Sequence, residues 1–141
     1  MPLSTPHPGL VIAYSYLWRR ETGFGRFEGV KERPAVVVLA KRAVDRNLVV
    51  TVAPITHSEP NRETPSIEIP ARVKEHLGLD GSRSWVILNE TNEFQWPGYD
   101  LRPVPRKPGQ FAYGVLPQNL FAKISRGVAE LRDKGVMPVN R

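Results

Sequence analysis

Two short apolar runs, both rich in β-branched residues, restrict the fold of this chain more than any other feature. They are residues 35–40 (AVVVLA) and residues 48–53 (LVVTVA). Each run is long enough for one strand and too short for a typical helix, so each predicts a buried strand. Arg33 lies just before the first run and Thr56 just after the second. If the two strands are neighbours, a guanidinium and a hydroxyl meet at one mouth of the sheet, a layout that suits a phosphate.

Proline marks the edges of these and other apolar runs. The chain has 14 prolines among 141 residues, about twice the usual share. Because proline cannot donate a hydrogen bond to a β ladder, this placement indicates short strands and not a disordered proline-rich tract. The prolines in question are Pro8, Pro34, Pro54, Pro70 and Pro117.

The remaining pattern predicts more short strands and two helices. The further strands are expected at 9–18, 66–69, 84–88 and 111–116. A brief helix starts at Pro70 and stops at Gly78, and a longer one covers 118–134. The apolar stripe of the longer helix is Leu120, Phe121, Ile124, Val128 and Leu131.

Short strands at close spacing, closed by one helix, predict a small and strongly curved β-barrel of the α+β class. A chain of 141 residues fits one domain. We expect a flexible leader over 1–8, a single domain over 9–135 and a tail over 136–141.

The composition favours an anionic partner. Lys and Arg outnumber Asp and Glu by 20 to 14, which gives a net charge of +6 and favours nucleic acid, an acidic protein or a membrane surface. The chain has no cysteine, so disulfides and thiolate sites are excluded. Neither a signal peptide nor a membrane-spanning segment is evident, so we expect a soluble, cytoplasmic protein.

Several common chemistries have no support in the sequence. Gly23, Gly25 and Gly29 have the wrong spacing for a dinucleotide-binding loop, and no Walker phosphate loop is present. The three histidines are scattered, so no metal site is expected. A Gly-x-Ser-x-Gly elbow is also missing, which leaves a hydrolase triad without support.

Four features taken together resemble the MazF/PemK (Kid-like) family of toxins, which are sequence-selective endoribonucleases of toxin–antitoxin pairs. They are an opening strand at 9–13, a loop that carries glutamates, the run 33–39 and the run 52–56. A looser likeness continues through 114–117 and the last helix. The resemblance implies an SH3-like barrel, a homodimer, an acidic antitoxin as partner, and cleavage of RNA without a metal or other cofactor.

The resemblance also assigns site residues. The family's main catalytic positions, the arginine of an Arg-Pro pair and the threonine of a Pro-x-Thr run, correspond here to Arg33 and Thr56. A guanidinium fork binds two phosphate oxygens, and a hydroxyl donates to one. The plainer interpretations are a surface ion pair for Arg33 and a β-branched strand end for Thr56.

The chain departs from the family pattern in two places. Its first loop is longer than usual, so the family's loop carboxylate corresponds to Glu21, Glu28 or Glu32. The family's Asp-Gln stretch appears here as Asn89-Glu90.

RNA cleavage by its own 2′-hydroxyl needs a base, an acid for the 5′-oxygen and a cation for the phosphorane. Arginine, with a pKa above about 12, is a poor proton carrier, and a threonine hydroxyl is no base. His57 and Glu90 are therefore the candidates for the base, because histidine titrates near neutrality, and Glu28 is a further one. Strand alternation points His57 away from Thr56 unless the strand has already ended.

Two stretches mix cations with aromatic rings, as in proteins that stack unpaired bases and follow the RNA backbone. The rings could instead pack a small barrel or a dimer seam, which is the favoured interpretation for Trp85 and Tyr113. The RNA-binding candidates are Arg19, Arg20, Arg26, Lys31, Trp96 and Arg102.

Two rival functions stay open. A CcdB-like toxin has this kind of barrel but binds DNA gyrase and cleaves no nucleic acid. A plain RNA-binding barrel binds RNA in a salt-sensitive way and leaves it intact.

Overall fold

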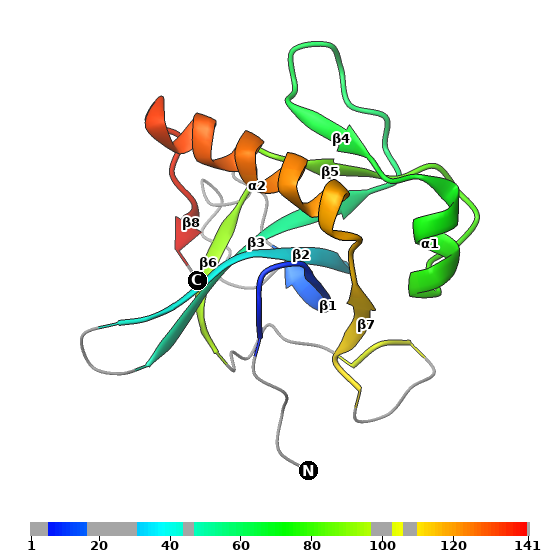
Figure 1. The fold of residues 1–141 in the computed structure, drawn as a ribbon, viewed down its shortest axis with the longest axis horizontal. Helices are drawn as coiled ribbons and strands as arrows, with labels where there is room; N and C mark the ends of the chain where they lie inside the picture. The colour runs from blue at the N-terminus through cyan, green and yellow to red at the C-terminus, as the bar shows by residue number, and fades with distance from the viewer. Residues whose placement is uncertain (1–5, 17–30, 44–46, 97–102, 106–109, 141) are drawn as a thin grey trace.

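The computed structural model describes residues 6–16, 31–43, 47–96, 103–105 and 110–140. One sheet and two helices account for the regular structure within these ranges (Figure 1), which confirms the predicted α+β class. The elements in chain order are β1 (Leu10–Tyr16), β2 (Lys31–Arg42), β3 (Leu48–Thr56), β4 (Ser66–Glu68), α1 (Ala71–Leu77), β5 (Trp85–Ile87), β6 (Asn92–Trp96), β7 (Ala112–Val115), α2 (Gln118–Asp133) and β8 (Val139–Asn140).

The sheet is strongly curved but open, so the predicted SH3-like barrel is not confirmed. Its hydrogen-bonded order is β4-β5-β3-β2-β1-β7, with β6 added to β3 and β8 added to β6. Along one edge, β3 pairs first with β6 and then with β5. The sheet bends where the partner changes (Figure 1), and no pairing among the described strands joins the two ends, β4 and β7.

One face of the central strands is covered by the helices. Val36, Ile55 and Val86 pack there with Leu77 of α1 and Ile124 of α2. Figure 1 shows α2 lying across this face of the sheet. The predicted stripe of the long helix is confirmed, because Ile124 and Val128 are buried and Leu120, Phe121 and Leu131 pack beside them.

The other face is buried by the curvature of the sheet itself. Tyr14 of β1 stacks on Phe94 of β6 with ring centroids 4.8 Å apart, although the two strands are not hydrogen bonded to each other. Leu10 and Ile12 extend this cluster along β1, at alternate positions with Tyr14. Because both faces of β2 are buried, its apolar run is continuous and not alternating.

The structure adds two strands where the sequence predicted none, β6 and β8. Asn92, Phe94 and Trp96 of β6 alternate inward, but Asn92 is polar, so only two apolar residues mark the strand in the sequence. β8 has two residues and runs parallel to β6. In addition, β2 starts at Lys31, so Arg33 lies inside a strand and not in front of one.

No helix within the described ranges is long and apolar enough to cross a membrane.

Gly78 ends α1 in a left-handed conformation (φ 71°, ψ 24°), as its position after the apolar stripe predicts. We expect Gly78→Ala to lower the unfolding free energy by about 1 kcal/mol, because a Cβ strains this backbone conformation. Gly81→Ala is the matched control: a Cβ at either site meets open space, but only Gly78 has a positive φ. Denaturant titrations should show a clear loss for Gly78→Ala and little change for Gly81→Ala. Equal effects would contradict the assignment.

Candidate functional site

The pairing of β2 with β3 brings Arg33 and Thr56 together. Ala35 lies opposite Pro54 in this antiparallel ladder. The next residues on the same face, two positions back on β2 and two positions on along β3, are Arg33 and Thr56. Directly opposed residues of such a pair have Cβ atoms about 4.5–5.5 Å apart. The continued register therefore makes Arg33 and Thr56 neighbours at one end of the ladder.

Two cavities meet at these two side chains. The first, about 430 Å³, is lined by Arg33 and Thr56 together with His57, Asp80 and Ser84. The second, about 420 Å³, is lined by Arg33 and Thr56 together with Glu59, Asn89 and Glu90. Both volumes lie within the range of about 300–1,000 Å³ that is typical of ligand sites. Arg33 is half-buried and lines both cavities.

Thr56 is the last residue of β3 and is nearly buried. Its Oγ1 accepts a hydrogen bond from the backbone N–H of Ser58 at 3.1 Å. This local turn holds the hydroxyl at the strand end. A hydroxyl that accepts one hydrogen bond can still donate one, so Thr56 can offer its hydrogen to an anion in either cavity.

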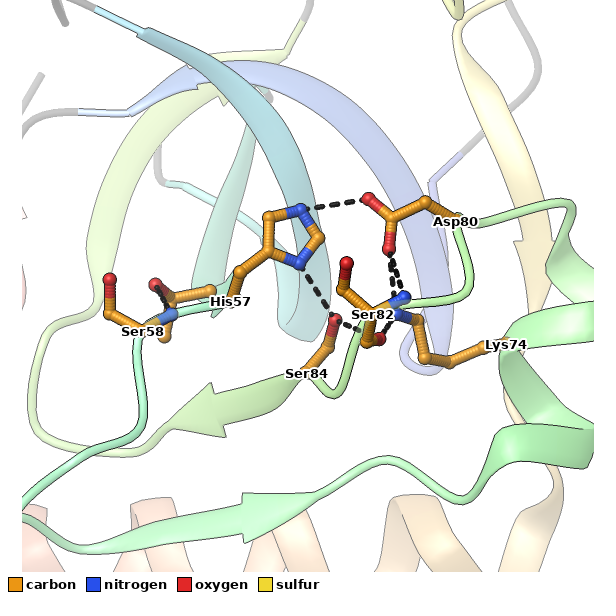
Figure 2. Close-up of polar contacts among 7 residues, drawn as sticks. His57, Ser58, Lys74, Asp80, Ser82 and Ser84 are labelled. Atoms are coloured by element: carbon orange, nitrogen blue, oxygen red, sulfur yellow. Dashed lines mark hydrogen bonds and ion pairs between the residues drawn. The ribbon is translucent and has the colours of Figure 1, made fainter.

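His57 follows the end of β3, so strand alternation no longer directs its side chain away from the cavity. Its Nε2 lies 2.9 Å from Oδ2 of Asp80, and its Nδ1 lies 3.3 Å from Oγ of Ser84 (Figure 2). The side chain is 60% exposed and lines the first cavity. Both ring nitrogens thus have a polar neighbour, and the ring orientation is defined.

The carboxylate of Asp80 accepts hydrogen bonds from three directions. Oδ2 faces His57, and Oδ1 accepts from Nζ of Lys74 at 2.9 Å and from the backbone N–H of Ser82 at 3.0 Å (Figure 2). Asp80 lies in the loop between α1 and β5, and its side chain is 54% exposed. This loop carboxylate therefore links helix α1 to the end of strand β3.

Lys74 is buried, with only 5% of its side chain exposed. Besides Asp80, its ammonium also donates to the backbone carbonyl of Ser82. A buried ammonium is tolerated only with such partners. Lys74 therefore fixes the loop from the helix side.

The surroundings of Asp80 lower its pKa. Partial loss of solvent acts in the opposite direction and raises it. The hydrogen bonds from Lys74 and from the Ser82 backbone, together with the charges of His57 and Lys74, outweigh that effect. Asp80 is therefore ionised at neutral pH.

The other predicted site residues are placed as follows. Glu90 lines the second cavity, which His57 does not line. Trp96 lines neither cavity: it pairs with Leu48 at the opposite end of β3 from Thr56 and packs half-buried against the inner cluster. Trp85 is buried, and Tyr113 packs beside the helix-covered core, as expected. Glu28, Arg19, Arg20, Arg26 and Arg102 lie outside the described residues, and only the backbone of Lys31, at the start of β2, is described.

Sequence reasoning missed Asp80, Lys74 and Ser84. A lysine on a short helix and an aspartate before a glycine are ordinary surface and turn residues by pattern. Only the apolar partners of Lys74 within α1, Val73 and Leu77, place it near the buried side of the helix. Within the described ranges, no three histidine, aspartate or glutamate side chains are grouped so as to hold a metal ion.

Removing Asp80 should lower the unfolding free energy more than removing its partner Lys74. We expect Asp80→Ala to lower the unfolding free energy by about 1–3 kcal/mol, because it leaves the buried ammonium without its charged acceptor. Lys74→Met should cost less, about 1 kcal/mol, because Met keeps the apolar packing and the half-exposed carboxylate can be hydrated. Urea titrations of both variants test this, and a larger loss for Lys74→Met would contradict it.

The lowered pKa of Asp80 makes its contribution to stability depend on pH. The folded-state value lies below the ordinary 3.8, so the contribution is present above about pH 5 and is lost as the pH falls through the lowered value. The unfolding free energies of the wild type and Asp80→Asn should therefore differ less at about pH 2.5 than at about pH 5. A difference that grows on acidification would show that folding raises the pKa of Asp80 and does not lower it.

Comparison with known proteins places this chain in a family. A comparison with curated proteins found no match to the chain. A family model described as "PemK-like, MazF-like toxin of type II toxin-antitoxin system" matches residues 24–95. That match covers half of the chain and includes Arg33, Thr56, His57, Asp80 and Glu90. The chain therefore belongs to the PemK-like, MazF-like family of toxins of type II toxin–antitoxin systems, a family whose members pair with an antitoxin.

Proposed function

We propose that this protein is an endoribonuclease that cleaves single-stranded RNA in the cytoplasm through attack of a 2′-hydroxyl, and that an acidic antitoxin neutralises it. The observation that carries the proposal is the meeting of Arg33 and Thr56 at the junction of two cavities. The basic balance of the chain, +6 overall, favours a polyanionic substrate. As in the family resemblance, the active form would be a homodimer, and no metal ion would take part.

Arg33 and Thr56 would bind the scissile phosphate. The planar guanidinium can hold two phosphate oxygens, and its charge offsets the extra negative charge of the phosphorane. The Thr56 hydroxyl would donate to one of these oxygens. Neither group has to gain or lose a proton, which agrees with their chemistry.

An in-line reaction needs the attacking and leaving oxygens on opposite sides of phosphorus, and two separate cavities that share Arg33 and Thr56 can hold the two groups. Glu90 lines one cavity and His57 the other, with Arg33 and Thr56 common to both. Glu90 as a carboxylate would accept the proton of the 2′-hydroxyl while its oxygen bonds to phosphorus. His57 as an imidazolium would donate a proton to the 5′-oxygen as the P–O5′ bond breaks. The products are a 2′,3′-cyclic phosphate and a 5′-hydroxyl, and water restores both side chains.

The purified protein should cut RNA in the presence of a chelator. We expect Arg33→Ala and Thr56→Ala each to reduce the cleavage rate by at least about tenfold, because each removes a contact to the phosphorane. Arg126→Ala is the matched control: Arg126 is an exposed arginine of α2 that lines neither cavity, so its removal should leave the rate unchanged. Circular dichroism checks that all variants are folded.

Wild-type rates in folded Arg33→Ala and Thr56→Ala would remove the site assignment. Salt-sensitive RNA binding without cleavage would favour the non-catalytic RNA-binding function instead. Growth inhibition that depends on DNA gyrase, with RNA left intact, would favour the CcdB-like function.

A further inference from the structure

The two nitrogens of His57 have chemically different neighbours. Nε2 faces a carboxylate oxygen of Asp80 at 2.9 Å, and Nδ1 faces the hydroxyl of Ser84 at 3.3 Å (Figure 2). A carboxylate can only accept hydrogen bonds, whereas a hydroxyl can donate or accept. Nε2 therefore faces a group that can only accept a hydrogen bond, whereas Nδ1 faces a group that can donate or accept one.

Asp80 decides which nitrogen keeps its hydrogen. Because ionised Asp80 has no proton to give, the close contact requires a hydrogen on Nε2 in both charge states of the ring. The neutral ring is then the Nε2–H tautomer, with its lone pair on Nδ1. Nδ1 is the atom at which His57 gains and loses a proton.

Asp80 is itself held in a fixed orientation. Its Oδ1 accepts from Lys74 at 2.9 Å and from the Ser82 backbone at 3.0 Å, on the side away from His57. Lys74 is buried in α1 and also donates to the carbonyl of Ser82. The carboxylate cannot rotate without breaking hydrogen bonds to a buried ammonium, which would be costly.

The contact of Nδ1 with Ser84 is the one that a substrate can replace. At 3.3 Å it is longer than the 2.9 Å contact of Nε2 with Asp80. The Ser84 hydroxyl also has a second neighbour, the carbonyl of Ser82 at 3.5 Å. His57 and Ser84 both line the cavity that reaches Arg33, so an oxygen bound there can exchange with the hydroxyl at Nδ1.

We propose that Asp80, braced by buried Lys74, is a positioning residue that holds His57 in the Nε2–H form and makes Nδ1 the proton donor to the leaving 5′-oxygen. This deepens the proposed function and rests on it. The proton on Nδ1 passes to O5′ as the P–O5′ bond breaks. Nδ1 keeps the electron pair of its N–H bond, so the imidazolium becomes the neutral ring with its hydrogen on Nε2. Asp80 remains a carboxylate throughout.

Asp80→Asn should reverse the tautomer. At the Oδ1 position of Asp80, two donors converge, Nζ of Lys74 and the backbone N–H of Ser82. The amide oxygen of the variant must therefore take this position. The amide NH₂ then faces Nε2 of His57 and can only donate to it. The neutral ring would therefore accept at Nε2 and carry its hydrogen on Nδ1.

Nitrogen NMR of the imidazole rings tests this without any activity. In the wild type at high pH, Nε2 of His57 should have the shift of a protonated nitrogen and Nδ1 that of a bare one, and Asp80→Asn should exchange the two. The chain has only three histidines, so the His57 signals are identified by their loss in His57→Ala. A wild-type ring protonated on Nδ1, or a tautomer unchanged in Asp80→Asn, would overturn the proposal.

RNA cleavage gives the second measurement. We expect Asp80→Asn to lower kcat by at least about tenfold with KM within about twofold, because proton transfer and not phosphate binding is affected. In a His57→Ala background the same change should have no further effect. Glu68→Gln is the matched control. Glu68 forms an ion pair with Arg83, so this change also converts a paired carboxylate to an amide, but Glu68 lines neither of the two cavities that Arg33 lines.

The outcomes separate the two proposals. If the wild type cleaves RNA and Asp80→Asn cleaves it equally well, the positioning role fails and the nuclease function stands. An equal loss of kcat from Asp80→Asn with or without His57 also overturns the positioning role. If the wild type cuts no RNA, the proposed function fails, and the tautomer alone decides whether Asp80 positions His57.

Discussion

The antiparallel register of β2 and β3 is the constraint on which the candidate site depends. Ala35 faces Pro54, and this alone makes Arg33 and Thr56 neighbours on one face. A slip of one residue would turn one of the two side chains to the opposite face. Such a slip is costly because both faces are buried: Val36 packs beneath the helices, and Val37 packs inside the curve of the sheet. The apolar runs that fold the protein thus also position its polar pair.

A second constraint comes from the loop between α1 and β5. It carries Asp80, and Lys74 fixes it from within α1. The loop follows the turn at Gly78 and, together with His57 at the end of β3, lines the first cavity. The Lys74–Asp80 ion pair therefore stabilises the fold and also orients Asp80 toward His57. A substitution at Asp80 is expected to change both the unfolding free energy and the orientation of the ring. Stability measurements and ring tautomers separate the two effects, which activity alone cannot do.

Much of the fold was predictable from the sequence, because apolar patterning is strong where burial is complete. The β2 and β3 runs, the α2 stripe and the Gly78 stop all follow from spacing and backbone preference. Strand β6 was not predicted, since its inward Asn92 is polar and only Phe94 and Trp96 remain as inward apolar residues. The open sheet depends on β3 exchanging one partner for another, which no local pattern records. Lys74 and Asp80 were missed because their burial and pairing arise only from tertiary packing.

The roles proposed for Glu90 and His57 give the proposed reaction a direction along the RNA, because the two residues line different cavities. Asp80 lines the same cavity as His57, whereas Glu59 and Glu90 line the other cavity, and Arg33 lines both. Glu59 forms an ion pair with Arg83, and Glu90 is the carboxylate to which the proposal assigns the role of base. An RNA strand bound across Arg33 would thus place the nucleotide with the attacking 2′-hydroxyl in the Glu90 cavity. The nucleotide that leaves through its 5′-oxygen would occupy the His57 cavity. Base selectivity on the two sides of the cut would then depend on two different sets of lining residues.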